Sequence, residues 1–364
     1  MAQENKIKIA FLIPSLQPGG MERVMSEIMD YCAKQANIEI HLVLFGLKRE
    51  VFYEIPEKTI LHKPKFEFDN SKRFWHTIKT IFFIRKTIKS IHPKTILSYG
   101  ELWNNLVLLA LLFTKYPVFV SDRCQPNKSL GRLHDFLRKN LYQNAKGVIA
   151  QTSQAKSIYE AGLVNNANIT VIGNPIQKQE AVNTPREKIV LTVGRLIESK
   201  HHDALIKLFV KINSLDWKLV IVGGDALKQT NRKNLQTLID SLNANDKVRL
   251  AGNQKDVASF YKKSSIFAFT SSSEGFPNVI GEALSYGLPV VTFDCVAGPS
   301  DMILENENGH LVKLFDYDDF ELKLSKLMRN DPLRELMSKN APPTVKKFEK
   351  DTISNQYLDF ILNN

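Results

Sequence analysis

Short apolar runs rich in β-branched residues alternate with amphipathic stretches along most of this chain. The first half contains runs predicted as strands, with helices predicted between them, for example over residues 21–34 and 131–143; these runs are "KIKIAFLIP", "IEIHLVLF", "KTILSY", "YPVFVS" and "KGVIAQ". The second half repeats the pattern, with helices predicted over residues 202–212, 231–242 and 257–263; its runs are "KIVLTVG", "WKLVIVGG", "KVRLAG", "SIFAFTS" and "LPVVTF". This alternation is typical of parallel sheets with helices on both faces.

A polar segment separates the two halves. Residues 174–188, "NPIQKQEAVNTPREK", contain two prolines and no apolar period, which is typical of a linker. We therefore predict an α/β protein with two doubly wound Rossmann-like domains, residues 1–175 and 176–345, that face each other across a cleft. A C-terminal helix, about residues 346–364, is expected to pack back onto the first domain. Ligands bind beyond the carboxyl ends of parallel strands, so the cleft is the expected site.

Composition places the chain among globular proteins of the cytoplasm. Its 364 residues, 43% of them hydrophobic, are enough to build two cores. The start, "MAQENKIKIA", lacks the features of a signal peptide, and Cys32, Cys124 and Cys295 are too widely spaced for a disulfide framework or a paired metal site. The longest apolar run, Leu106 to Phe113, is well short of the roughly 18 residues that a membrane-spanning helix needs.

Two glutamates lie eight positions apart in "TSSSEGFPNVIGEALSYGLPVV", residues 270–291. Glu274 is predicted in the loop that follows a strand, and Glu282 on the next helix, which begins near Pro277 and ends before Gly287. Both carboxylates can face the expected site. The alternative is that each is a solvated glutamate beside a structural helix.

The whole string resembles the Glu-x7-Glu signature of the retaining glycosyltransferases of family 4, which have the GT-B fold. This resemblance implies that Glu282 binds the ribose of the donor nucleotide and that Glu274 holds hydroxyls of the donor sugar. It also assigns donor contacts to the start of the helix, at Phe276, Pro277, Asn278 and Val279. A carboxylate that accepts from vicinal hydroxyls forms charge-assisted hydrogen bonds and rejects ligands that lack them.

Three further segments resemble the same family. In "VGRLIESKHHDALI", Arg195 and Lys200 correspond to the cations that bind the donor diphosphate, which makes them candidate catalytic residues together with Glu274. In "PSLQPGGMERVM", Gly19 and Gly20 correspond to a turn near the donor phosphate and the acceptor, and near Asn253 the backbone is expected to meet the base. Taken singly, a solvated basic turn and an ordinary Gly-Gly turn remain alternatives.

One position departs from the family pattern. Many relatives have a histidine after the strand that corresponds to "VFVS", whereas this chain continues with Asp122, Arg123 and Cys124. No histidine role is carried over. We assign Asp122 and Arg123, with Gly19 and Gly20, to the acceptor side.

A basic amphipathic helix is predicted in "SKRFWHTIKTIFFIRKTIKSIHPK", residues 71–94. Its predicted apolar face is formed by Phe74, Ile78, Ile81, Ile84, Ile88 and Ile91, and its basic residues include Lys72, Arg73, Lys79 and Lys86. Residues 1–175 carry +10 of the net charge of +11, so this helix could meet an anionic membrane surface or a lipid diphosphate. The alternative is a sheet-covering helix with a solvated face.

The function predicted from these features is retaining transfer of a hexose or N-acetylhexosamine from a UDP-sugar to a glycan, carried by a lipid, in bacterial surface polysaccharide or glycan biosynthesis. We expect no cofactor, no metal and no nucleic-acid partner, and peripheral association with the cytoplasmic membrane face. Asp316 and Asp318 match a metal-binding Asp-x-Asp of another fold, but helix capping explains them better. Two alternatives remain: an epimerase or dehydrogenase, disfavoured by the missing Gly-x-Gly-x-x-Gly, and a non-catalytic basic module that binds membrane or nucleic acid.

Overall fold

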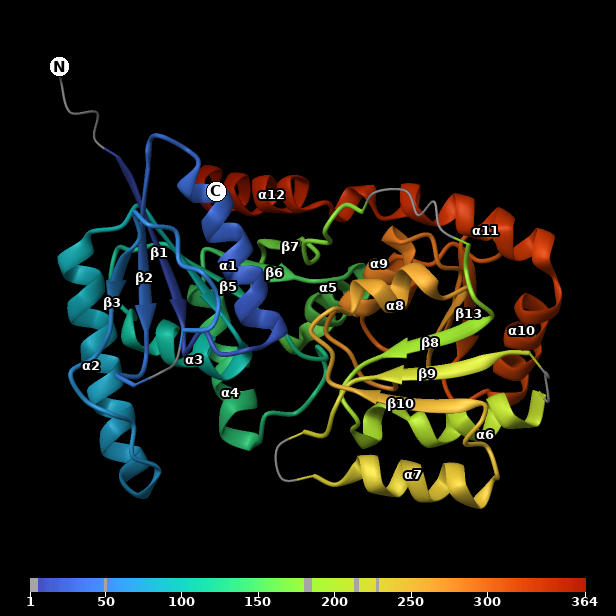
Figure 1. Ribbon diagram of the computed structural model, residues 1–364. Coiled ribbons are helices and arrows are strands. Elements are labelled where there is room, and N and C mark those ends of the chain that lie inside the picture. Colours follow the sequence, from blue (N-terminus) through green and yellow to red (C-terminus); the bar gives the residue numbers. More distant parts are fainter. Residues whose placement is uncertain (1–5, 49–50, 180–184, 213–215, 227–228) are drawn as a thin grey trace. The chain divides into compact units, whose positions relative to one another are not determined.

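The computed structural model describes residues 6–48, 51–179, 185–212, 216–226 and 229–364. The chain divides into two compact units. Unit 1 comprises Met1–Pro175 and Lys350–Asn364, and unit 2 comprises Ile176–Glu349. In each unit, helices cover a twisted sheet (Figure 1), and the strand pairs are parallel. The predicted α/β architecture with two doubly wound sheets is confirmed.

Unit 1 contains a sheet with the strand order β3-β2-β1-β4-β5-β6-β7. Its strands are β1 (Ile7–Ile13), β2 (Ile38–Leu44), β3 (Ile60–His62), β4 (Thr95–Tyr99), β5 (Val118–Ser121), β6 (Gly147–Ala150) and β7 (Ile169–Val171). Its helices are α1 (Gly20–Ala33), α2 (Arg73–Ile91), α3 (Glu101–Ala110), α4 (Arg132–Leu141), α5 (Ser153–Ile158) and α12 (Lys350–Asn363), with short turns η1 (Asn70–Lys72), η2 (Tyr142–Asn144) and η3 (Tyr159–Leu163).

The two edge strands of this sheet, β3 and β7, were not predicted from the sequence. Each contains only three residues, and the side chains of β3 are exposed or half-buried. A central strand such as β1 is covered on both faces, and its residues from Ile9 to Ile13 are fully buried. Burial on both faces produces the continuous apolar run that identifies a central strand, and an edge strand does not need one.

Unit 2 contains a sheet with the strand order β10-β9-β8-β11-β12-β13. Its strands are β8 (Ile189–Val193), β9 (Lys218–Val222), β10 (Val248–Gly252), β11 (Ile266–Phe269), β12 (Val290–Asp294) and β13 (Gly309–Lys313). Its helices are α6 (His202–Ile212), α7 (Asn231–Ser241), α8 (Ala258–Lys263), α9 (Asn278–Ser285), α10 (Tyr317–Arg329) and α11 (Asp331–Thr344), with short turns η4 (Glu198–Lys200), η5 (Pro299–Asp301) and η6 (Lys346–Phe348).

The C-terminal helix α12 belongs to unit 1. The Phe360 ring packs edge-on against Phe119 of β5 at a centroid distance of 5.2 Å, and Tyr357 is fully buried. Lys350 at the start of the helix donates to Asp30 of α1 over 2.8 Å. The chain therefore returns to the sheet of unit 1 after completing unit 2.

The strand order of each sheet reverses at one point, and this topological switch point is where open α/β sheets bind ligands. In unit 1 the reversal lies between β1 and β4, and in unit 2 it lies between β8 and β11. The residues that follow these four strands are therefore the first place to look for chemistry. Among the described residues, no helix combines the length and apolarity needed to cross a membrane.

Candidate active site

Lys200 and Glu274 form an ion pair across the switch point of unit 2. Lys200 ends η4, which follows β8, and Glu274 lies in the loop that follows β11. The Lys200 Nζ atom contacts Glu274 Oε1, and the two side chains are only 14% and 13% exposed. The ammonium also lies over the Phe269 ring, 4.7 Å from its centroid. The structure thus brings together two predicted residues that are far apart in the sequence.

The two loops that carry this ion pair are joined by their own hydrogen bonds. Thr270 Oγ1 donates to the Lys200 carbonyl over 2.7 Å, and the Ser272 amide donates to the Ser199 carbonyl over 2.8 Å. His201 Nε2 lies 3.0 Å from Ser272 Oγ. These contacts fix the loops of Lys200 and Glu274 relative to each other. Apart from Lys200 itself, the sequence did not single out the residues that form them.

Glu282 lies on α9, the helix on which it was predicted, one turn along from Asn278. Its Oε2 atom accepts a hydrogen bond from the Tyr261 hydroxyl of α8 over 3.0 Å. Tyr261 is only 2% exposed and stacks on Tyr286 with a centroid distance of 5.2 Å. A stacked, buried tyrosine therefore orients the carboxylate, and nothing in the sequence pattern had identified it.

The ends of β8, β9 and β10 bring the segments of Arg195 and Asn253 to neighbouring positions of the sheet edge. Gly223 has a φ of +143°, and a Cβ atom there would lie 1.9 Å from the Gly194 carbonyl oxygen. A Cβ atom at Gly224 would lie 2.6 Å from the Asn253 side-chain amide. At Gly223 only glycine allows this close approach of two backbones. The side chains of Arg195 and Asn253 are both exposed.

The Gly19-Gly20 turn follows β1 at the switch point of unit 1. The Tyr53 hydroxyl donates to the Gly19 carbonyl over 2.9 Å and accepts from its amide over 3.1 Å. The Glu22 carboxylate folds back over the turn, so a Cβ atom at Gly19 would lie 2.3 Å from Glu22 Oε2. Burial raises the pKa of Glu22, and the Arg123 charge partly offsets this rise. The Glu22 carboxylate thus lies against Gly19, and the turn is closed by a tyrosine that the sequence did not reveal.

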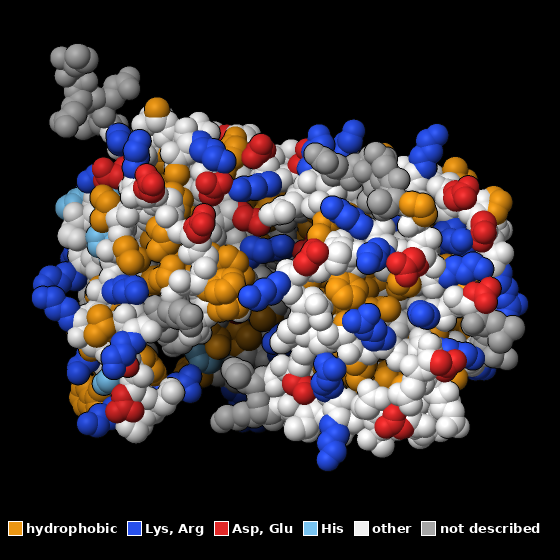
Figure 2. All heavy atoms as spheres, in the orientation of Figure 1, with side chains coloured by type: hydrophobic (Ala, Val, Ile, Leu, Met, Phe, Trp, Pro, Cys, Tyr) orange, Lys and Arg blue, Asp and Glu red, His pale blue; other side chains and the backbone are white. Residues whose placement is uncertain are grey.

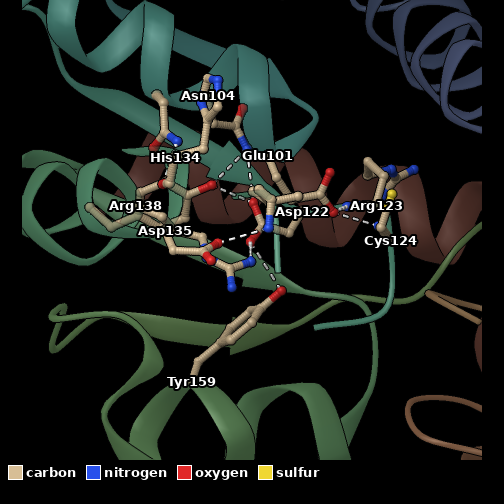
Figure 3. A network of polar contacts seen from close by, with 12 residues as sticks. Glu101, Asn104, Asp122, Arg123, Cys124, His134, Asp135, Arg138 and Tyr159 are labelled. Carbon is tan, nitrogen blue, oxygen red and sulfur yellow. Dashed lines mark hydrogen bonds and ion pairs between the residues drawn. The ribbon is translucent and has the colours of Figure 1, made fainter. Parts of the chain in front are cut away.

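The prediction that Asp122 contacts the acceptor is wrong. Its carboxylate is fully buried in the polar network of Figure 3 and pairs with Arg138 over 3.6 Å. Hydrogen bonds to this carboxylate come from Asn104 Nδ2 over 3.0 Å, from the Tyr142 hydroxyl and from the Tyr159 hydroxyl over 3.2 Å. Burial, followed by the charge of Glu101, raises the pKa of Asp122 to about 6. A carboxylate with both oxygens occupied inside the protein has no acceptor to offer a ligand, so its role is structural.

Arg123 is held in place from several sides. Its backbone amide donates to Glu101 Oε1 over 2.6 Å, and the Cys124 amide donates to the same oxygen (Figure 3). The guanidinium lies 4.3 Å from the centroid of the Tyr99 ring and donates to the Tyr357 hydroxyl of α12 over 3.2 Å. The C-terminal helix therefore positions the cation that follows β5, and this contact joins residues from opposite ends of the chain.

The start of α2 carries an exposed surface of basic and aromatic side chains. We name this the α2 surface; it comprises Lys72, Arg73, Phe74, Trp75, Lys79, Phe82 and Lys86. Phe74, Trp75 and Phe82 are 69%, 64% and 66% exposed, and the four basic residues are exposed as well. Figure 2 shows basic side chains interspersed with hydrophobic ones over this helix.

Phe74, which helical spacing places on the apolar face of this helix, is not buried against the sheet. The buried residues of α2 are Thr80, Ile84, Thr87, Ile88 and Ile91. In Figure 1 the N-terminal part of α2 extends past the strand ends of its sheet. Helical spacing alone cannot reveal where a helix leaves the sheet that it covers.

No metal site is apparent within the part of the chain that the structure describes. No group of three or more His, Cys, Asp or Glu side chains could hold an ion there. Asp316 caps α10, because its Oδ1 atom accepts from the Asp319 amide over 3.0 Å. The capping interpretation of Asp316 is confirmed.

Two doubly wound units with this strand order define the GT-B fold class. The galactosyltransferase WaaB of the lipopolysaccharide outer core superposes with a TM-score of 0.80 at 21% identity, covering 98% of this chain and 99% of that one. Anabaena HepE in complex with UDP superposes with a TM-score of 0.81 at 18% identity, covering 98% and 100%. These likenesses confirm the fold.

Sequence comparison then identifies the family. Residues 18–180 match the model of Glycosyltransferase Family 4, and residues 173–343 match that of Glycosyl transferases group 1. An uncharacterized glycosyltransferase of Methanocaldococcus jannaschii is 30% identical over 73% of each chain. The chain belongs to glycosyltransferase family 4 and is a glycosyltransferase.

Similar proteins include glycosyltransferases of bacterial glycan biosynthesis. One is the N-acetylgalactosamine-N,N'-diacetylbacillosaminyl-diphospho-undecaprenol 4-alpha-N-acetylgalactosaminyltransferase of Campylobacter jejuni, 28% identical over 98% of this chain and 99% of its own. The amylovoran biosynthesis glycosyltransferase AmsD of Erwinia amylovora is 26% identical over 97% and 99%. Relatives of this chain thus include bacterial polysaccharide and lipid-linked glycan glycosyltransferases.

Proposed function

We propose that this protein is a retaining, metal-independent glycosyltransferase that moves a hexose or N-acetylhexosamine from a UDP-sugar to a lipid-linked glycan. The observation that carries the donor part is the Lys200–Glu274 ion pair at the switch point of unit 2, with Glu282 on the adjoining helix. A cation at this crevice suits a diphosphate, and two carboxylates beside it suit ribose and sugar hydroxyls.

The proposed reaction exchanges one glycosidic bond for another. The bond from the sugar anomeric carbon to the diphosphate oxygen breaks, and the oxygen of an acceptor hydroxyl forms the new bond to that carbon. UDP leaves with the bonding electron pair, and its phosphate oxygen takes the hydroxyl proton. Lys200 and Arg195 supply positive charge where the leaving group becomes more negative, and this supports a reaction without a metal.

The acceptor part of the proposal rests on the relatives and on the α2 surface. The name of the Campylobacter jejuni relative specifies a diphospho-undecaprenol carrier. Exposed lysines and arginine beside exposed Phe74 and Trp75 suit an anionic bilayer surface and a lipid diphosphate. We place the enzyme at the cytoplasmic face of the membrane, where UDP-sugars are available.

The donor assignment is tested by ligand stabilisation. UDP is expected to raise the Tm of the protein, since a ligand at 100 times its Kd stabilises the folded state by about 2.7 kcal/mol. Glu282→Ala is expected to weaken UDP binding about ten-fold or more, because the ribose loses charge-assisted hydrogen bonds of roughly 1.5–3 kcal/mol. Thermal shift and calorimetry with UDP, GDP, ADP and NAD measure both effects.

Glu307→Gln provides the control for this experiment, because Glu307 is an exposed carboxylate of the same unit, far along the chain from α9. Its UDP affinity should equal that of the wild type. Stabilisation by GDP or ADP but not UDP would overturn the nucleotide assignment. Stabilisation by NAD alone would favour the dehydrogenase alternative.

The α2 surface is tested by charge reversal. Replacing Lys72, Lys79 and Lys86 with Glu is expected to reduce binding to vesicles of 30% phosphatidylserine by at least ten-fold, because each basic residue contributes about 1 kcal/mol near an anionic surface. The difference in vesicle binding between this variant and the wild type should decrease as the salt concentration rises. Co-sedimentation measures it.

The matched control replaces three exposed lysines of unit 2, Lys233, Lys262 and Lys263, with Glu. This variant has the same net charge as the α2 variant and should keep most of the vesicle binding. Equal losses in both variants would mean that only total charge matters, and no loss in either would leave α2 as a structural helix.

A further inference from the structure

A cavity of about 260 Å³ lies in unit 1. It is lined by Gln17, Gly46, Leu47, Lys48, Glu67 and Phe68. Gln17 follows β1, and Gly46 to Lys48 follow β2, so the cavity lies at the carboxyl edge of the sheet. This is the edge at which parallel sheets bind ligands, and the cavity lies where the neighbouring strands β1 and β2 end.

The lining of the cavity has the chemistry that binds a sugar ring. Gln17 offers both a donor and an acceptor, Glu67 offers acceptors, and Lys48 offers donors. Phe68 contributes an aromatic surface for the apolar face of a ring. Binding sites for small molecules typically measure roughly 300–1,000 Å³, so a slightly smaller cavity suits one small ligand, such as a single sugar residue.

The charges of the cavity favour a neutral ligand. Lys48 Nζ lies 3.8 Å from Glu67 Oε1, so the one cation and the one anion of the lining balance. A diphosphate needs excess positive charge, and this lies beyond the cavity at Lys72 and Arg73. The cavity and the α2 surface therefore suit different parts of one molecule.

A short ordered segment connects the cavity to the start of α2. The Phe68 ring packs edge-on against His76 of α2 at a centroid distance of 5.8 Å. Its neighbour Asp69 donates its amide to His76 Nδ1 over 2.8 Å and accepts from the Ser71 amide over 2.8 Å. These contacts set the position of Phe68 relative to the α2 surface.

We propose that this cavity is a carbohydrate subsite that binds a neutral sugar residue of the acceptor glycan. The inference rests on the proposed function, because it assigns to the cavity the part of the acceptor between the reacting hydroxyl and the lipid diphosphate. Phe68 stacks on the sugar ring, and Gln17, Glu67 and Lys48 bind its hydroxyls. The subsite selects acceptors by the sugar that lies in it.

Saturation-transfer NMR with methyl glycosides of glucose, galactose, mannose, GlcNAc and GalNAc tests this proposal. At least one glycoside is expected to bind the wild type in the presence of UDP. Phe68→Ala and Gln17→Leu should each weaken that glycoside about five-fold or more, the cost of one lost hydrogen bond or ring contact. Gln17 is exposed, so its replacement leaves the fold intact.

Phe66→Ala is the matched control. Phe66 also packs edge-on against His76, at 5.9 Å, but does not line the cavity. The Phe66→Ala variant should bind the glycoside with the affinity of the wild type. Equal affinity in the Phe68 and Gln17 variants, or the absence of any glycoside signal, would overturn the subsite, and so would displacement of the glycoside by inorganic pyrophosphate. UDP affinity, measured in the same samples, separately reports failure of the proposed donor site.

Discussion

Lys200→Met is expected to lower turnover by about 10²–10³-fold, the usual effect of removing one well-aimed charge or donor from a developing anion. The ammonium is held at the switch point of unit 2 by Glu274 and by the Phe269 ring. A side chain that is already in place stabilises the leaving diphosphate without a cost of reorganisation. The affinity for UDP should fall less than turnover, because the charge on the diphosphate is greatest as the bond breaks.

Glu274→Gln is expected to abolish most transfer but to retain or improve UDP binding. The carboxylate that we propose for binding the donor sugar is also the ionic partner of Lys200, so its neutralisation would free the ammonium for the diphosphate. Steady-state kinetics with a UDP-sugar, together with calorimetry of UDP, separates the two roles. Near-normal turnover in either variant would remove that residue from the reaction.

The same pair has a measurable role in stability. Each single variant leaves a largely buried charge or polar group without its partner, at a cost of about 1–3 kcal/mol. The double variant Lys200→Met/Glu274→Gln removes both charges and is expected to recover much of that loss without recovering turnover. Recovery of both stability and turnover in the double variant would show that the ion pair contributes only to stability.

Arg138→Met is expected to destabilise unit 1 by about 3–5 kcal/mol at pH 8, because it leaves the Asp122 carboxylate buried without its cation. The two side chains are 2% and 0% exposed. The double variant with Asp122→Asn should recover part of the loss. Lys156→Met is the control, since Lys156 pairs with Glu160 at the surface and should change stability by about 0.5 kcal/mol or less.

The effect of Arg138→Met is expected to depend on pH. The pKa of Asp122 is raised to about 6, so the folded state binds this proton more tightly than the unfolded state. The stabilisation from this protonation is present at low pH and is lost as the pH rises through 6. The decrease in the free energy of unfolding caused by Arg138→Met should therefore be smaller at pH 5 than at pH 8. Urea unfolding at both values measures it, and equal losses would contradict the charged state of Asp122.

Much of the fold could be predicted because central strands and their covering helices have a periodic sequence. The predicted run "KIKIAFLIP" contains β1, and the helix predicted over residues 202–212 coincides with α6. The strands β3 and β7 escaped prediction because three-residue edge strands have no apolar period. The sequence does not show where α2 leaves the sheet and exposes Phe74, because the end of a sheet leaves no mark on the helix that passes it.

Some residues of the candidate site could likewise be predicted from the sequence, and others could not. Glu274, Glu282 and Lys200 could be singled out from the sequence because they belong to short segments that resemble motifs of the family; their roles remain a proposal. Asp122 was misassigned, because its position after a strand does not reveal the buried partners that surround it.

The sequence by itself determined the alternation of strands and helices, the two sheets and the motif residues, because these depend on the chemistry of near neighbours. Only the tertiary structure decided which distant side chains meet. Tyr53 closes the Gly19 turn, Tyr261 orients Glu282, and Tyr357 from α12 holds Arg123. Each of these contacts depends on how elements pack, and packing brings together residues whose separation along the chain carries no periodic signal.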